Sequence, residues 1–466
     1  MARLPVPGTQ LTDLERLGPG DPGGRIPVEV RELIEVLRQG GHAAYVVGGS
    51  LRDVLLGREP DDWDLATDAR PERIVELFPA AVYENRFGTV AVRHAGGTFE
   101  ITTFRRDHEY ADFRRPHRVE FGEDIGSDLA RRDFTVNALA WGGPPGGGLV
   151  LVDPHAGLDD LRDGLLRAVG DPMARFGEDA LRMVRAVRLS ATLGFSIEPK
   201  TLAGIERRAE LVRYLSGERI AVELEKLLAA ATPSVGLRPL EATGLLRGIS
   251  PELADQRGTP QSKVPGEDLW DHTVRSVDAA PADRPIVRLA ALLHDLGKPA
   301  TFADGRFIGH ENVGAELAAE LLLRLRFPRS TVDRVALLVR QHMFAYESSW
   351  GDAAIRRFIA KIGRPALDEL FELRRADNLG SGLEPGAGGL DELRTRVTEQ
   401  LAAEVVLDRR DLAVDGDDLI GELGAVPGPR LGAVLDHLLE AVVDDPALND
   451  RPTLLLMAQA ELAEDA

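Results

Sequence analysis

The chain has 466 residues, with 76 acidic and 56 basic side chains and a formal net charge of −20 at pH 7. Single hydrophobic cores seldom grow past about 250 to 300 residues, so we expect at least three domains. The negative charge argues against a protein that coats nucleic acid non-specifically, because such binding relies on many Lys and Arg contacts to phosphates.

Composition also bounds the compartment and the metal chemistry. No stretch approaches the roughly eighteen apolar residues of a membrane span, and the N-terminus lacks the apolar core of a signal peptide, which predicts a cytoplasmic protein without membrane contact. The chain contains no Cys, which excludes disulfides, thiolate metal sites and a cysteine nucleophile. Any metal must therefore be held by Asp, Glu and His, which suits hard cations such as Mg²⁺.

Charge is unevenly distributed along the chain. Residues 162–226 hold 12 basic and 10 acidic side chains, whereas residues 401–466 hold 4 basic and 15 acidic ones. Phosphates should therefore bind in the middle of the chain, and the acidity of the C-terminal region argues against RNA contact there.

The first third of the chain predicts an α/β unit. Residues 28–37 (VEVRELIEVL) have an amphipathic helical period, and residues 43–47 (AAYVV) form an apolar run typical of a buried strand. β-branched residues and alternation predict strands at 89–93 and 98–104, and a last strand at 149–153.

Outside these strands the sequence predicts helices, two linkers and one loop. Beyond residue 171 the hydrophobic period is helical almost throughout. Pro, Gly and charge predict linkers at residues 250–266 and 380–389. Residues 104–128 are charged with little apolar period, which predicts a mobile loop.

The densest chemical signal is VVGGSLRDVLLGREPDDWDLAT, at residues 46–67. An apolar strand enters Gly48 and Gly49, where missing Cβ atoms let backbone N–H groups approach a phosphate at the start of a helix. Arg52 follows one turn later, where it would reach the same anion. In isolation such a turn is a weak signal, and Asp53 alone would be a residue that structures the helix.

A pair of carboxylates strengthens that signal. On a strand, Asp62 and Asp64 face the same side while Trp63 turns into the core. Two carboxylates this close repel unless a cation bridges them, which is what phosphoryl transfer through two metal ions needs. An isolated D-x-D is more often a solvated acidic turn, and the preceding glycine turn reverses that preference.

These residues resemble the head signature of the class II tRNA nucleotidyltransferase and poly(A) polymerase family, GG-x-x-R-D-x-x-L-G-R followed by D-x-D. The matching positions are Gly48, Gly49, Arg52, Asp53, Leu56, Gly57, Arg58, Asp62 and Asp64. The family commonly has a small residue and Val at positions 50 and 51, where this chain has Ser and Leu. The resemblance implies a Mg²⁺-dependent head that uses Asp62 and Asp64 as catalytic metal ligands.

Two further segments resemble motifs of the same family. The segment RRDFTVNALAW, at 131–141, is similar to the second motif, which implies that Arg131, Arg132 and Asp133 help to hold ribose and triphosphate. Adjacent guanidiniums suit phosphate oxygens, while Asp133 would either orient them or accept a ribose hydroxyl. The segment at 153–161 resembles the third motif, and we interpret it as structural.

The fourth motif concerns base selection. Asp179, Arg182, Arg185 and Arg188 recur every third position along a predicted helix, in a segment that resembles the family's nucleotide-template motif, E-D-x-x-R. A carboxylate accepting from an exocyclic amine beside an Arg that donates to a ring nitrogen would accept cytosine and adenine and reject uracil and guanine. Ordinary salt bridging on an exposed helix is the alternative. Residues 215–228 resemble the last neck motif, a stabilising helix that Ser216 would cap.

The second half carries a different constellation. His272, His294, Asp295 and Asp377 follow the order of the HD phosphohydrolase superfamily, which implies a divalent metal held between helices. His310 and His342 are possible additional ligands outside this minimal pattern. A helical scaffold without a functioning site is the alternative.

The resemblance implies a multidomain α+β chain, with a polymerase-β-like head containing a mixed sheet and with all-α neck, HD and C-terminal domains. We expect an N-terminal tail, head, neck, linker, HD domain and C-terminal helical region at residues 1–26, 27–170, 171–250, 251–265, 266–380 and 381–466.

The implied activity is template-independent addition of C, C and A from CTP and ATP to the 3′ end of tRNA. The alternatives are CC-only or A-only addition, a poly(A) polymerase, an HD phosphohydrolase with a nucleotide-sensing head, or a binding-only RNA chaperone. In the family, CC-only enzymes shorten the segment that corresponds to residues 104–128, and its full length here disfavours that alternative.

Overall fold

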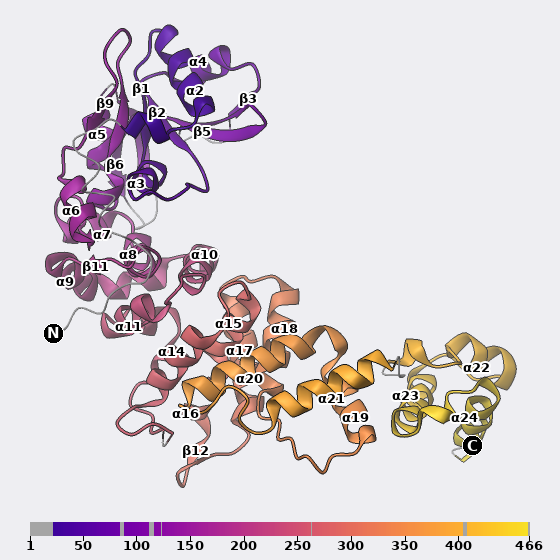
Figure 1. Ribbon diagram of the computed structural model, residues 1–466. Coiled ribbons are helices and arrows are strands. Elements are labelled where there is room, and N and C mark those ends of the chain that lie inside the picture. Colours follow the sequence, from indigo (N-terminus) through magenta and orange to yellow (C-terminus); the bar gives the residue numbers. More distant parts are fainter. Residues whose placement is uncertain are drawn as a thin grey trace. The chain divides into compact units, whose positions relative to one another are not determined.

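The computed structural model describes residues 22–83, 88–110, 116–122, 124–261, 263–403 and 408–464. The chain divides into two compact units, Met1–Pro251 and Glu252–Ala466, which are described separately (Figure 1). Within the described residues, no helix combines the length and the apolar character that crossing a membrane requires.

A mixed sheet of seven strands forms the centre of the first unit (Figure 1). In spatial order its strands are β3 (Ala81–Tyr83), β4 (Thr89–His94), β5 (Gly97–Thr103), β2 (Asp64–Thr67), β1 (Ala44–Val47), β8 (Ala140–Gly143) and β9 (Val150–Val152). Only β2 and β5 pair in parallel, and the other neighbours are antiparallel. The sequence prediction of strands at four of these places is confirmed, as is the mixed sheet.

The helices of the head follow the predicted amphipathic pattern. Helix α2 (Val28–Gln39) buries Val30, Leu33, Ile34 and Leu37, which share one face at the i, i+3, i+4 and i+7 spacing. Helix α3 (Gly49–Leu55) follows β1 directly. The remaining helices of this part are η1 (Pro22–Arg25), α4 (Pro71–Leu77), α5 (Ile125–Ala130), η2 (Thr135–Asn137) and α6 (Gly157–Asp163).

Residues 104–128, predicted to form a mobile loop, contain regular secondary structure in the part that the structure describes, so the prediction of a loop is wrong there. Strands β6 (Arg105–Tyr110) and β7 (Pro116–Phe121) pair antiparallel in a separate two-stranded ribbon, and α5 follows them. Phe121 packs beneath the guanidinium of Arg70, 4.8 Å from the ring centre. Residues 111–115 lie outside the described residues.

After α6 the first unit is helical. Asp153, which precedes α6, accepts hydrogen bonds from the backbone N–H groups of Gly157 and Leu158 at the start of that helix, in agreement with a structural role for its segment. The helices are α7 (Pro172–Glu178), α8 (Leu181–Leu193), α9 (Pro199–Arg208), η3 (Ala209–Tyr214), α10 (Gly217–Leu228), α11 (Ser234–Ala242) and α12 (Leu245–Ile249). Helix α13 (Pro251–Ala254) begins at the last residue of the first unit and continues into the second. The two-residue strands β10 (Leu165–Leu166) and β11 (Ser196–Ile197) pair in parallel.

The second unit is a helical assembly. Helices α14 (Leu269–Ala279), α15 (Pro285–Leu293), α17 (His310–Arg324), α18 (Arg329–Gln341) and α20 (Leu367–Gly380) pack together (Figure 1). Between and after them lie α16 (Lys298–Thr301), the β12–β13 pair (Phe302–Ala303 and Arg306–Phe307), α19 (Asp352–Ile362), η4 (Arg364–Ala366), α21 (Leu390–Ala402), η5 (Arg409–Asp411), α22 (Gly416–Leu423), α23 (Pro429–Asp444), η6 (Pro446–Leu448) and α24 (Arg451–Glu464). Leu419, Leu438 and Leu454 are fully buried in an apolar cluster of the last three helices.

Candidate active site and candidate metal centre

The glycine turn between β1 and α3 brings backbone and charged side chains close together. Gly48 has a φ of 76°, and a Cβ atom there would lie 2.6 Å from Nη1 of Arg132. A side chain at position 48 would therefore displace this guanidinium. Ser50, the departure from the family pattern, is buried and donates a hydrogen bond to the carbonyl of Val47 at 3.0 Å.

Asp64 opens β2, while Asp62 and Trp63 precede the strand. The prediction that the three residues lie on one strand is therefore wrong, and Trp63 is half-buried rather than part of the core. Burial raises the pKa of Asp64, Arg132 opposes this shift, and the nearby charge of Asp62 adds to it. A carboxylate in such a place lacks a full counterion, so a divalent cation would stabilise its charged form.

Both carboxylates line a cavity of about 730 Å³ in the first unit. Of the predicted site residues, Gly48, Gly49, Arg52, Asp62, Asp64, Arg132, Asp133, Arg185 and Arg188 line it. Arg131, Asp179 and Arg182 do not appear among its lining residues. Residues that sequence reasoning left out of the site also line it, and these include Asp53, Arg58, Asn137 and Lys226.

Most guanidiniums of the cavity are already paired with carboxylates. Arg52 donates to both oxygens of Asp53 at 2.9 and 2.8 Å and to Oδ1 of Asn137 at 2.6 Å. Asp128, which is 1% exposed, accepts from Arg131 at 2.6 Å and from Arg132 at 3.2 Å. Nε of Arg132 has no hydrogen-bond partner among the described residues. Arg132 is therefore less fully engaged than Arg52.

Asp133 is a second fixed carboxylate. Its Oδ2 lies 2.7 Å from Nη2 of Arg185, and its Oδ1 accepts from Asn137 and from the backbone N–H of Phe134, both at 2.9 Å. Burial opposes ionisation, yet Arg185 and the hydrogen bond from Asn137 hold the pKa of Asp133 well below its usual value. The structure thus places Asp133 as an orienting partner of Arg185 and Asn137.

The predicted helix that would carry Asp179, Arg182, Arg185 and Arg188 at every third position is interrupted at its start. Helix α8 begins at Leu181, so Asp179 lies outside it, as the C-cap of α7. Oδ2 of Asp179 accepts from Arg219 at 2.7 Å. Arg182 donates to Glu178 at 2.6 Å and to the carbonyl of Arg131 at 2.9 Å.

Helix α10 supplies the partners that sequence reasoning missed. Glu223, which is 4% exposed, accepts from Arg188 at 2.8 Å and lies 3.5 Å from Arg185. The signal available in the sequence was the i, i+4 spacing of Arg219 and Glu223, which places both on one face of the helix. Ser216 stands at the N-cap of α10, but its side chain makes no capping hydrogen bond, so the predicted cap is wrong in that respect.

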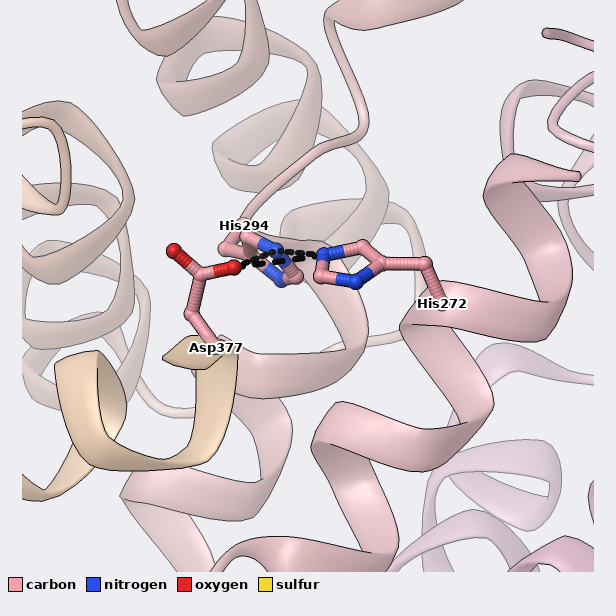
Figure 2. A group of neighbouring side chains, drawn as sticks. All are labelled: His272, His294 and Asp377. Carbon is pink, nitrogen blue, oxygen red and sulfur yellow. Dashed lines mark hydrogen bonds and ion pairs between the residues drawn. The ribbon is translucent and has the colours of Figure 1, made fainter. Parts of the chain in front are cut away.

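The second unit brings the four predicted HD residues together in its interior. Nε2 of His272, on α14, lies 3.1 Å from Nε2 of His294 at the end of α15. The same His272 atom lies 3.3 Å from Oδ2 of Asp295 and 3.3 Å from Oδ1 of Asp377, on α20. Figure 2 shows the side chains of His272, His294 and Asp377 converging from three segments.

Two histidines outside the predicted minimal set join this cluster. Nε2 of His310, the first residue of α17, lies 3.4 Å from Oδ1 of Asp295, and Nε2 of His342, at the end of α18, lies 3.6 Å from the same oxygen. All the members are buried. The donor set, imidazole nitrogens and carboxylate oxygens, fits a divalent metal ion.

Lysine ammonium groups also lie beside the carboxylates of Asp295 and Asp377. Lys298 Nζ lies 2.6 Å from Oδ2 of Asp295, and Lys263 Nζ lies 3.2 Å from Oδ1 of Asp377. Burial works against ionisation, but His294 and Lys298 hold the pKa of Asp295 well below its usual value. Both carboxylates are therefore held as anions, the form that binds metal.

Four segments of the chain match known protein families. Residues 44–167 match the family described as Poly A polymerase head domain, and residues 194–257 match the probable RNA and SrmB-binding site of polymerase A. Residues 239–381 match the HD domain, and residues 312–458 match a putative tRNA nucleotidyltransferase domain 2.

Comparison with individual proteins covers most of the chain. The chain is 35% identical to a CCA-adding enzyme of Levilactobacillus brevis over 91% of this chain and 96% of that one. It is 32% identical to a CCA-adding enzyme of Geobacillus stearothermophilus over 91% of this chain and 94% of that one. Among solved structures, the CCA-adding enzyme of Bacillus stearothermophilus in complex with CTP has a TM-score of 0.70 at 29% identity, over 94% of this chain and 98% of that one.

Proposed function

This chain belongs to the family of CCA-adding enzymes, and from that premise we propose that it adds C, C and A from CTP and ATP to the 3′ end of tRNA. The observation that carries the proposal is the cavity lined by Asp62, Asp64, the glycine turn and Arg132, where Asp64 and Arg132 both lie beside Gly48. Relatives that are CCA-adding enzymes match this chain at 31 to 35% identity over most of their length.

The chemistry is nucleotidyl transfer. The 3′ hydroxyl of tRNA loses its proton to solvent, and its oxygen forms a new bond to the α-phosphorus of the nucleoside triphosphate. The bond between the α-phosphorus and the α,β-bridging oxygen breaks, and pyrophosphate leaves with that oxygen. Asp62 and Asp64 would hold divalent ions, which we propose to be Mg²⁺ and which lower the pKa of the attacking hydroxyl and neutralise the triphosphate.

The residues of the cavity divide the remaining work. Arg132 is the guanidinium beside Gly48 and Asp64, and it lines the cavity, so we propose that it binds the triphosphate. Arg52 and Asp133 line the same cavity and are held by Asp53, Asn137 and Arg185, so they would bind the triphosphate and ribose from positions that these contacts fix in advance.

Base selection by Asp179 and Arg182 remains our proposal, with an added condition. Asp179 must release Arg219, and Arg182 must release Glu178, before either side chain can meet a base edge. Arg185 and Arg188 already line the cavity and would bind the nucleotide from α8.

The activity is tested with tRNA that lacks its terminal CCA, incubated with Mg²⁺ and with CTP alone, ATP alone or both. We expect two C additions with CTP alone and three additions with both nucleotides, and none in the Asp62→Ala protein. A run of many A residues would indicate a poly(A) polymerase. Extension of only CC-ending tRNA with ATP would indicate an A-adding enzyme.

A second proposed function rests on the buried histidine and aspartate cluster. We propose that His272, His294, Asp295 and Asp377 hold a divalent metal ion and that this unit hydrolyses phosphoesters, such as phosphomonoesters or 2′,3′-cyclic phosphates. The alternative, a head that only senses nucleotides without catalysis, is disfavoured because sensing alone needs no carboxylate pair like Asp62 and Asp64.

Localisation of the protein in the cytoplasm stays a prediction from the sequence.

A further inference from the structure

Four arginines that line the cavity of the first unit each have a carboxylate partner. The pairs are Arg52–Asp53, Arg132–Asp128, Arg185–Asp133 and Arg188–Glu223. Two further cationic side chains, Arg58 and Lys226, line the same cavity. Neither forms an ion pair with any of the described residues, and Nη1 of Arg58 donates only to the carbonyl of Thr192, at 3.3 Å. These two cations are therefore the ones that lack a neutralising carboxylate.

Arg58 and Lys226 lie at the same end of the cavity. The side-chain contacts between α10 and the region of α8 advance in the same direction along both segments. In chain order, the pairs are Asp179–Arg219 and Arg188–Glu223. One helical turn further lie Thr192 on α8 and Lys226 on α10, and both residues line the cavity. Because Arg58 donates to Thr192, both cations flank the place where the last turns of these helices meet.

The walls at this end leave space for a ligand but also carry negative charge. Residues 229–231 are all alanine, and they line the cavity with side chains that end at Cβ. Glu59 and Asp61 line the cavity as well and would repel an anion. An anionic ligand therefore binds here only where Arg58 and Lys226 outweigh these carboxylates.

Nucleotide addition needs a second anionic ligand beside the triphosphate. In phosphoryl transfer the attacking and the leaving oxygen lie roughly in line, on opposite sides of the phosphorus. The triphosphate is proposed to bind Arg52 and Arg132 beside the glycine turn, so the strand that carries the attacking hydroxyl must enter from another side. That strand is a chain of phosphodiesters, and cations without a carboxylate partner are the groups that suit it.

We infer that Arg58 and Lys226 bind a backbone phosphate among the last nucleotides of the tRNA and so hold the strand whose 3′ hydroxyl attacks. This contact rests on the proposed nucleotide addition and deepens it, because it assigns residues to the tRNA strand rather than to the triphosphate. The competing explanation is that Lys226, in the last turn of α10, only stabilises the end of the helix through the helix dipole.

Binding of tRNA in the absence of nucleotide distinguishes the two explanations. Fluorescence anisotropy of tRNA that lacks its terminal CCA, titrated with full-length protein at about 50 to 200 mM KCl, gives the Kd and its salt dependence. In Lys226→Gln and in Arg58→Gln we expect the Kd to rise about 3- to 10-fold. The slope of log affinity against log salt should fall by about 0.7, the value for one phosphate contact with a single strand. The KM for CTP should stay within about twofold of wild type.

The control for these variants is Arg31→Gln. Arg31 is an exposed residue of α2 that does not line the cavity, and its replacement removes the same charge from the same unit. This variant should keep the Kd and the salt slope of wild type. A lower Tm of Lys226→Gln, with an unchanged Kd and an unchanged slope, overturns the contact in favour of a role at the helix end. A higher KM for CTP with an unchanged Kd for tRNA overturns it in favour of triphosphate binding.

Neutral linkages in the tRNA identify the phosphate that is bound. A methylphosphonate at one of the last three backbone linkages removes one charge from the strand. We expect one of these substitutions to weaken binding to wild type as much as Lys226→Gln does, and to weaken binding to Lys226→Gln no further, because both changes remove the same contact. Additive losses at all three linkages overturn the contact with Lys226. Wild-type protein that binds tRNA but adds no nucleotide overturns the proposed function instead, so the two failures are distinguishable.

Discussion

Arg219 donates a hydrogen bond of 2.7 Å to Asp179, which ties helix α10 to the C-cap residue of α7, two positions before helix α8 begins. Asp179 also accepts from the backbone N–H of Leu181 at 3.0 Å. The carboxylate proposed to read the base is therefore occupied, and Arg219 acts as its positioning partner. Nucleotide binding must exchange this contact for one with the base.

Loss of the base-reading pair should relax nucleotide choice. In Asp179→Ala or Arg182→Ala we expect UTP or GTP incorporation, relative to CTP, to rise about 10- to 100-fold, because a good bidentate base contact contributes about 1 to 3 kcal/mol of discrimination. Single-turnover assays with each triphosphate would measure the ratio. Arg219→Gln is the comparison, since it removes only the partner and should alter the ratio less. Unchanged ratios in both test variants would mean that these residues only form salt bridges.

The pair between Asp133 and Arg185 should make the first unit sensitive to acid. Arg185 and Asn137 outweigh burial and lower the folded-state pKa of Asp133, so the pair stabilises the fold above the unfolded value of 3.8 and is lost as pH falls towards the folded value. We expect Asp133→Asn to reduce the free energy of unfolding by roughly 2 to 3 kcal/mol at pH 7. Below pH 3.8 the difference from wild type should shrink.

Urea unfolding at pH 7, 5 and 3 would measure this difference. Asp159→Asn is the matched control, because Asp159 forms an exposed pair with Arg162 at 2.7 Å and an exposed pair contributes little. A loss in Asp133→Asn that is just as large at pH 3 would show that packing, rather than charge, is responsible.

Whether a feature could be predicted from the sequence depends on how far apart its residues lie along the chain. The turn at Gly48 and strand β1 were predictable because the apolar run, the glycines and the following helix are neighbours in the chain. The Asp179–Arg219 pair joins residues 40 positions apart, and no local pattern shows which carboxylate meets which guanidinium. The ribbon of β6 and β7 was missed because strand prediction relies on apolar alternation, which its charged sequence lacks.

The buried histidine and aspartate cluster shows the same limit of prediction from the sequence. His272, His294, Asp295 and Asp377 were predicted from their order in the chain, which matches a known pattern. His310 and His342 begin or follow helices α17 and α18, and only the packing of these helices places both beside one oxygen of Asp295. Sequence spacing alone does not distinguish such residues from ordinary buried histidines.

Removing the charge of Asp64 should abolish catalysis without weakening the fold. Burial and Asp62 raise the pKa of Asp64 against the opposing effect of Arg132, so without metal its ionised form costs stability above pH 3.8. We expect Asp64→Asn to reduce incorporation more than about 100-fold. Its Tm in the presence of a chelator should equal or exceed that of wild type at pH 7. A clearly lower Tm would mean that Asp64 has a structural role.

Nucleotide addition and the buried histidine cluster should be separable. Asp62 and Asp64 belong to the unit Met1–Pro251, whereas His294 and Asp295 belong to Glu252–Ala466, so neither ligand set contributes to the other. We expect full-length His294→Ala/Asp295→Ala to lose metal from the second unit and any phosphoester hydrolysis, and to keep CCA addition within about twofold of wild type. Asp62→Ala should show the opposite pattern. Because Lys298 would lose its buried partner Asp295, His294→Gln provides a milder variant that keeps this ion pair. If a folded His294→Gln protein fails to add nucleotides to tRNA, the two chemistries are coupled and their proposed independence is wrong.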